Sequence, residues 1–137
     1  MVVMTALPLG AGADQPPALP FQVILHPSNP VASVDRKFLV DVFLGKTTRW
    51  SNEQPVRPVD LPTNSATRER FSNEALGRSV SAVKAYWLQV IFSGHGVPPP
   101  ELDSDEQVVR FVARTVGAIG YVSGTAKIEG TKTISLN

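Results

Sequence analysis

The stretch SDEQVVRFVARTVGAIGYV, residues 104–122, predicts a helix that leads directly into a strand. Ser104 and Gln107 have the spacing of a capping box, in which a hydroxyl and a side-chain amide bind free N–H groups at a helix start. Gly117 is a typical residue after a helix end, and residues 118–122 are mostly apolar, as expected of a buried strand. The predicted buried stripe of the helix consists of Val108, Phe111, Val112 and Val116.

Helices and strands also alternate on the N-terminal side of this stretch. Apolar spacing predicts a helix capped by Ser33 and ended by Gly45, one that starts at Asn64 or Ser65 and ends at Gly77, and one capped by Ser79. The buried face of the last is expected to hold Val80, Val83, Trp87, Val90 and Ile91. Short strands are predicted at residues 21–25, 57–61 and 132–136. The pattern therefore predicts an α/β fold with one small mixed sheet and about four helices.

Composition and length are those of one globular domain. The chain has 137 residues, of which 42% are hydrophobic and 18% are charged. Its formal net charge of +1 predicts no general attraction to nucleic acid or to an anionic membrane. The absence of cysteine excludes disulfides, a thiol nucleophile and a thiolate metal site.

Residues 1–20 are interpreted as the remnant of a signal peptide followed by a proline-rich leader. Apolar residues precede Ala11-Gly12-Ala13, which has the small-x-small form of a signal-peptidase site, although no Lys or Arg occurs before Arg36. The segment is too short to span a bilayer. The folded domain is then residues 21–137, in a periplasmic or secreted protein. The alternative is a leader rich in alanine, proline and glycine on a cytosolic protein.

Several motifs for enzyme chemistry are incomplete. Gly45-Lys46-Thr47-Thr48 has the ending of a P-loop, but position 40 is Val and a helix precedes the motif where a strand is required. His26 and His95 have no further ligand at metal spacing, and no Gly-x-Ser-x-Gly motif occurs. We therefore expect no enzyme activity, no metal and no cofactor. We interpret five carboxylates as solvated surface residues: Asp60, Glu69, Glu74, Asp103 and Asp105.

The polar segment before the predicted 65–76 helix is the one candidate binding site. Free N–H groups at a helix N-terminus, with hydroxyls beside them, bind anions. The candidate oxyanion ligands are Asn64, Ser65 and Thr67, with Arg68 one turn into the helix. The alternative is a plain helix N-cap, which uses the same residue types.

Three segments together resemble the phosphate-binding proteins of ABC transporters. Residues 38–50, FLVDVFLGKTTRW, resemble the family's IFLGK-x-x-x-W signature, and residues 117–122, GAIGYV, resemble a strand of the family. Residues 59–71 take the place of the family's R-S-D-G-S-G-T turn, which binds phosphate at a helix start. In this turn only Ser65 and Thr67 carry over, because Leu61 stands in the place of the phosphate-contacting arginine.

The resemblance implies one lobe of a type II periplasmic-binding-protein fold. Family members bind ligand in a cleft between two lobes, in a chain more than twice this length. The implied function is substrate binding related to phosphate uptake, with phosphate or another oxyanion as ligand and a protein partner or a second copy supplying the other wall. The alternative is an interaction module of the periplasm that kept the fold and lost the anion site, with residues 94–101 as one contact surface.

Overall fold

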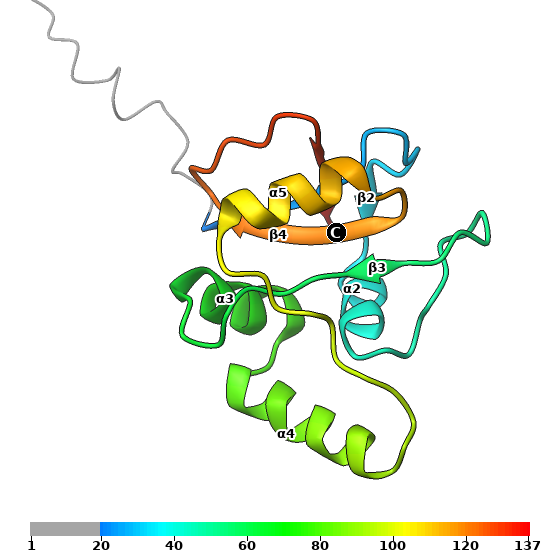
Figure 1. Cartoon of the computed structure of the whole chain (residues 1–137), viewed down its shortest axis with the longest axis vertical. Coiled ribbons are helices and arrows are strands. Elements are labelled where there is room, and N and C mark those ends of the chain that lie inside the picture. The colour runs from blue at the N-terminus through cyan, green and yellow to red at the C-terminus, as the bar shows by residue number, and fades with distance from the viewer. Residues whose placement is uncertain (1–19) are drawn as a thin grey trace, which may run out of the picture.

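Strand β4 (Ala118–Ser123) is an interior strand of a four-stranded mixed sheet with the order β3-β4-β1-β5. It pairs antiparallel with β1 (Phe21–Leu25) and parallel with β3 (Arg57–Pro58). Strand β5 (Lys132–Thr133) lies antiparallel on the other side of β1. Figure 1 shows this computed structural model, which describes residues 20–137.

A separate parallel pair of strands is formed by β2 (Ser33–Val34) and β6 (Ser135–Leu136).

The helices pack in layers around the sheet (Figure 1). The helices are α2 (Arg36–Phe43), α3 (Ala66–Phe71), α4 (Val80–Phe92) and α5 (Asp105–Arg114), and α3 continues as the π-helix η1 (Ser72–Leu76). The predicted α/β class, with a small mixed sheet and four helices, is confirmed.

Two neighbouring residues of β4 contact the helices on opposite faces of the sheet. Gly120 lies against α5, where a side chain would meet Val108 and Val112. Tyr121 is fully buried on the other face, and its ring stacks on Phe71 of α3 with centroids 3.8 Å apart. Because successive strand residues point to opposite faces, a glycine at 120 admits α5 while 121 anchors α3.

Helix α4 is attached to the end of α2 and lies farther from the sheet (Figure 1). The Trp87 indole Nε1 donates to the Phe43 carbonyl at 3.3 Å, and the Tyr86 hydroxyl donates to the Leu44 carbonyl at 2.7 Å. Both carbonyls belong to the end of α2, where helix geometry leaves acceptors free. Trp87 is therefore a core residue, as the sequence predicts, and Tyr86 is half-buried.

The predicted start of α2 is wrong by two residues. Ser33 does not cap the helix, because it belongs to β2, and Asp35 caps it instead by accepting from the Phe38 N–H at 2.7 Å. The predicted final strand is also divided. Residues 132–133 pair with β1, whereas 135–136 pair with β2, because the chain leaves one sheet for the other at Ile134.

Two residues predicted to be buried are exposed. Val116 lies beyond the end of α5 and is 43% exposed, because that helix ends at Arg114. Ile91 is 47% exposed, because only Val83 and Trp87 of α4 are fully buried.

The predicted leader lies outside the described residues except for Pro20. Within residues 20–137, no helix combines the length and the apolar character needed to cross a bilayer.

We expect Gly120→Ala to lower the free energy of unfolding by about 1–3 kcal/mol, the usual effect of overpacking a core. A Cβ at this position would lie 2.8 Å from Cγ1 of Val108 and 3.1 Å from Cγ2 of Val59. Urea denaturation of Gly120→Ala alone and in a Val108→Ala background measures the effect. Truncating Val108 removes the tightest contact, so Gly120→Ala should be less damaging there. An equal effect in both backgrounds would show that contact with Val108 is not the cause.

Candidate functional site

The predicted anion-binding segment lies at the start of α3. Ser65 caps this helix, with extended backbone angles and an Oγ that accepts from the Arg68 N–H at 3.1 Å. Asn64 precedes the cap and is exposed, and Thr67 is half-buried in the first turn. The segment therefore brings Asn64, Ser65 and Thr67 together at one end of a short helix, with the backbone of Arg68 as part of the cap.

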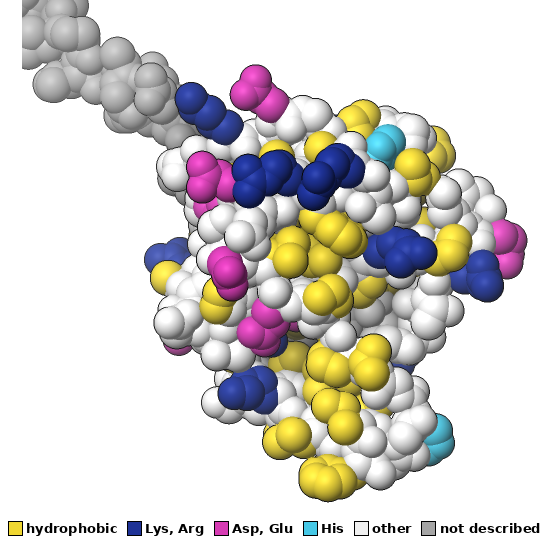
Figure 2. Space-filling view, viewed as in Figure 1, with side chains coloured by type: hydrophobic (Ala, Val, Ile, Leu, Met, Phe, Trp, Pro, Cys, Tyr) yellow, Lys and Arg dark blue, Asp and Glu magenta, His cyan; other side chains and the backbone are white. Residues whose placement is uncertain are grey.

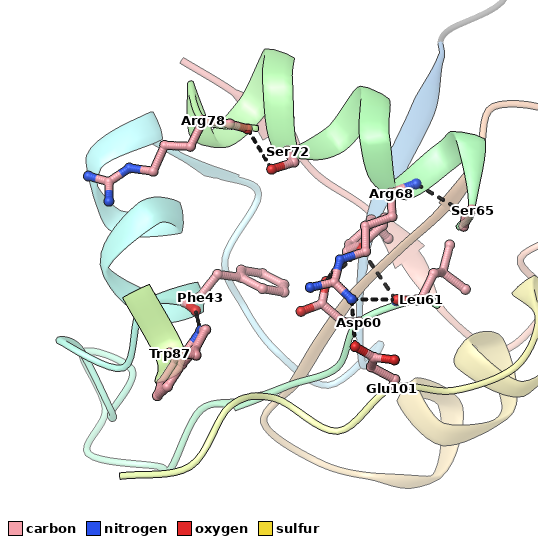
Figure 3. Close-up of polar contacts among 10 residues, drawn as sticks. Phe43, Asp60, Leu61, Ser65, Arg68, Ser72, Arg78, Trp87 and Glu101 are labelled. Carbon is pink, nitrogen blue, oxygen red and sulfur yellow. Dashed lines mark hydrogen bonds and ion pairs between the residues drawn. The ribbon is translucent and has the colours of Figure 1, made fainter. Parts of the chain in front are cut away.

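The Arg68 side chain extends from α3 into the protein and is 6% exposed (Figure 3). Its Nη1 donates to the Leu61 carbonyl at 2.9 Å and to Glu101 Oε2 at 2.8 Å. Its Nε lies 3.6 Å from Oδ1 of Asp60. The guanidinium is therefore shared between two carboxylates and one carbonyl, and these contacts orient it toward the segments that contain them.

The Asp60 carboxylate is buried, and it contacts a second polar group besides Arg68. The Tyr121 hydroxyl donates to Asp60 Oδ1 at 2.5 Å and accepts from the Leu61 N–H at 3.3 Å. The backbone of Asp60 also pairs with the segment before α5, donating to the Pro100 carbonyl and accepting from the Leu102 N–H, both at 2.8 Å. We call Asp60, Arg68, Glu101 and Tyr121 the polar cluster; it joins β4, α3 and the two segments that contain Asp60 and Glu101.

Burial governs the protonation of this cluster. Loss of solvent raises the pKa of Asp60 above 3.8, and the nearby Arg68 charge and the Tyr121 hydrogen bond only partly oppose this. The pKa of Tyr121 is raised by its own burial and by the Asp60 charge, so the phenol remains a donor. Glu101 is 48% exposed, so water screens its charge more than that of Asp60.

Sequence reasoning missed part of this arrangement. It assigned Asp60 to solvated surface, which is wrong because Asp60 is 7% exposed. Glu101 was not singled out at all. No local pattern marks either carboxylate, because their common partner Arg68 lies 8 and 33 residues away in the chain.

The other segments considered for chemistry lie elsewhere. Gly45 follows the end of α2 with φ +74°, so the P-loop-like residues do not open a helix. His26 and His95 bind nearby serine hydroxyls, at 2.8 and 2.9 Å. Among residues 20–137, no three His, Cys, Asp or Glu side chains are grouped so that they could hold a metal ion.

Solved structures of substrate-binding proteins share this fold. An ABC-type phosphate transport receptor from Vibrio cholerae matches with a TM-score of 0.66 at 20% identity, over 85% of this chain and 45% of that chain. A Clostridium perfringens protein assigned to the phosphate ABC transporter substrate-binding proteins, solved with bound phosphate, gives 0.68 at 22%, over 85% and 44%. PstS from Borrelia burgdorferi gives 0.64 at 12%, over 85% and 47%.

These matches establish the fold. The chain has the periplasmic-binding-protein fold, as the resemblance implied, and spans less than half the length of the proteins it matches. No protein-family model and no curated protein sequence matches it.

We expect Arg68→Met to lower the free energy of unfolding by about 3–5 kcal/mol, because it leaves buried Asp60 without its cation. Arg70→Met is the matched control on the same helix, since Arg70 is 62% exposed and should contribute at most about 1 kcal/mol. Adding Asp60→Asn to Arg68→Met should recover part of the loss in chemical denaturation. Additive effects of the two substitutions would contradict a direct coupling between them.

The raised pKa of Asp60 makes stability depend on pH. An acid with a higher pKa in the folded state binds its proton more tightly there, so stability falls as pH rises from about 3.8 through the folded pKa. We expect the stability of the wild type relative to Asp60→Asn to fall over that interval by up to about 1.4 kcal/mol per pH unit. Denaturation from about pH 3, below the ordinary pKa of an aspartate, to about pH 8 measures it. Asp103→Asn controls for the loss of one carboxylate, and a flat difference for Asp60→Asn would contradict the prediction.

Proposed function

We propose that this chain is a substrate-binding-like protein of the periplasm, related to the solute-binding proteins of phosphate ABC transporters, and that it binds an oxyanion such as phosphate at the start of α3. The direct ligands in this proposal are Asn64, Ser65 and Thr67. Arg68 is the fourth member, as a buried positive charge behind them. We propose no enzyme activity and no cofactor.

The observation that carries the proposal is the first turn of α3. The Ser65 Oγ and carbonyl already accept from the N–H groups of residues 68 and 69, and the Ser65 N–H donates to the Pro62 carbonyl. The N–H groups of residues 66 and 67 lie in the first turn and have no carbonyl of the helix to donate to. They are therefore the donors available to a ligand. Asn64 and Thr67 add polar side chains beside them. The bound phosphate in the Clostridium perfringens protein, which has the same fold, supports the choice of phosphate as the first anion to test.

Arg68 affects the expected affinity. Its guanidinium is bound to Leu61 and Glu101 and lies near Asp60, so it cannot give a ligand a bidentate contact without leaving them. In its observed position it would act through its charge, which the two carboxylates offset. A site made of N–H groups and hydroxyls on one lobe also stays open to water. We therefore propose weak binding, strengthened where a protein partner or a second copy supplies the opposing wall.

Thermal unfolding in phosphate, sulfate and molybdate at matched ionic strength tests the site. An anion at 100 times its dissociation constant should stabilise the fold by about 2.7 kcal/mol. For a domain of this size that is a rise in Tm of several degrees. We expect a rise for at least one anion, and its loss in the Ser65→Ala/Thr67→Ala variant.

Ser65→Ala also removes a helix cap, so the loss of response needs a matched control. Ser104 caps α5 in the same way, accepting from the Gln107 N–H at 3.2 Å. Ser104→Ala should lower stability by a similar amount, about 1 kcal/mol, yet keep the anion response. A wild type that responds to none of the anions would overturn the proposed site, and so would a response that survives the loss of Ser65 and Thr67.

A further inference from the structure

Helix α4 has an apolar outer face that no other described residue covers. Leu88, Ile91 and Phe92 are 56, 47 and 88% exposed, and Val97 in the following loop is 81% exposed. Figure 2 shows hydrophobic side chains gathered on α4 and on the chain that follows it toward α5. Lys84 is the one charged residue of the helix. A helix that is apolar on nearly all sides is typically buried on all sides, so the outer face of α4 is expected to have a partner.

The sequence of this face is graded in size along the helix. Ser81, Ala85, Leu88 and Phe92 are all exposed and follow the spacing i, i+4, i+7, i+11, which places them in one row. Ala82 and Ile91 lie beside the row. The N-terminal half of the face thus carries small side chains, and the C-terminal half carries large ones.

We infer that a second copy of this chain covers the face, with the two α4 helices antiparallel about a two-fold axis. The register that centres the axis between residues 86 and 87 sets Leu88 beside Ala85 of the second copy. The same register sets Phe92 beside Ser81 of the second copy. Each large side chain of the row then meets a small one, and the two-fold axis generates each contact in two equivalent copies.

Charge and area both fit a second copy. The row Ser81, Ala85, Leu88 and Phe92 holds no charge, because Lys84, the only charged residue of α4, lies to one side of it. Four large apolar side chains exposed by about half or more form a patch of the size that marks interaction sites on soluble proteins. A standard interface takes about 800 Å² from each partner, and Val97 extends the patch beyond the helix toward that area. Size grading along a helix would contribute nothing to contact with a lipid surface.

Sedimentation equilibrium of the full chain tests the inference. Protein concentrations from about 1 µM to 1 mM cover the Kd values expected of a modest interface. We expect a reversible dimer, and we expect Leu88→Glu to raise its Kd at least about tenfold, as for a residue near an interface centre. Val116→Glu is the matched control, because it makes the same kind of change at an apolar residue 43% exposed outside α4. Circular dichroism confirms that each variant is folded.

A size-exchange variant tests the register itself. Ala85→Leu sets two leucines against each other, so it should raise the Kd at least about tenfold. Adding Leu88→Ala restores one large and one small residue to each contact, so the double variant should return to within about threefold of the wild type. A chain that is monomeric up to about 1 mM overturns the inference, whether or not vesicles or other proteins then bind it. A dimer that ignores Leu88→Glu, or one that the exchange does not restore, overturns it as well.

Discussion

The buried guanidinium of Arg68 connects segments that are far apart in the chain. It reaches the Leu61 carbonyl, Asp60 and Glu101 at once, and Asp60 in turn accepts from Tyr121 of β4. A buried cation requires such partners, because moving it from water without them is unfavourable by several kcal/mol. These contacts connect α3 and the chain before α5 to β4 through one buried positive charge.

The same cation explains why the candidate anion site is built from hydroxyls and N–H groups. A guanidinium free at the helix start would attract an anion strongly, whereas this one is already balanced by internal carboxylates. Glu101 is the more exposed of its two acidic partners and thus lies where the protein meets solvent. The contacts that stabilise the fold therefore occupy the one cation that the proposed site could offer to an anion.

Local chemistry made much of the fold predictable from sequence. Glycines at 45 and 77 end helices with positive φ, and Ser79 and Ser104 cap the helices they were expected to cap. Of the two starts predicted for α3, Asn64 and Ser65, it is Ser65 that caps the helix. The start of α2 and the division of residues 132–136 were missed, because both depend on pairing between β2 and β6, about a hundred residues apart. The position of Ser65 at the candidate site was predictable for the same local reason. The direction of the Arg68 side chain was not, since Glu101 and Asp60 determine it through tertiary contacts.

The pairing of the strands also constrains the order in which the sheet can assemble. Every pair of named strands among the described residues includes β4, β5 or β6, so none can form before residue 118 is available. β1 is synthesised about a hundred residues before its neighbours β4 and β5. During synthesis the emerging chain therefore consists of helices and unpaired extended segments, and the sheet closes in the last stage. Such a chain exposes unpaired strand edges for most of its synthesis.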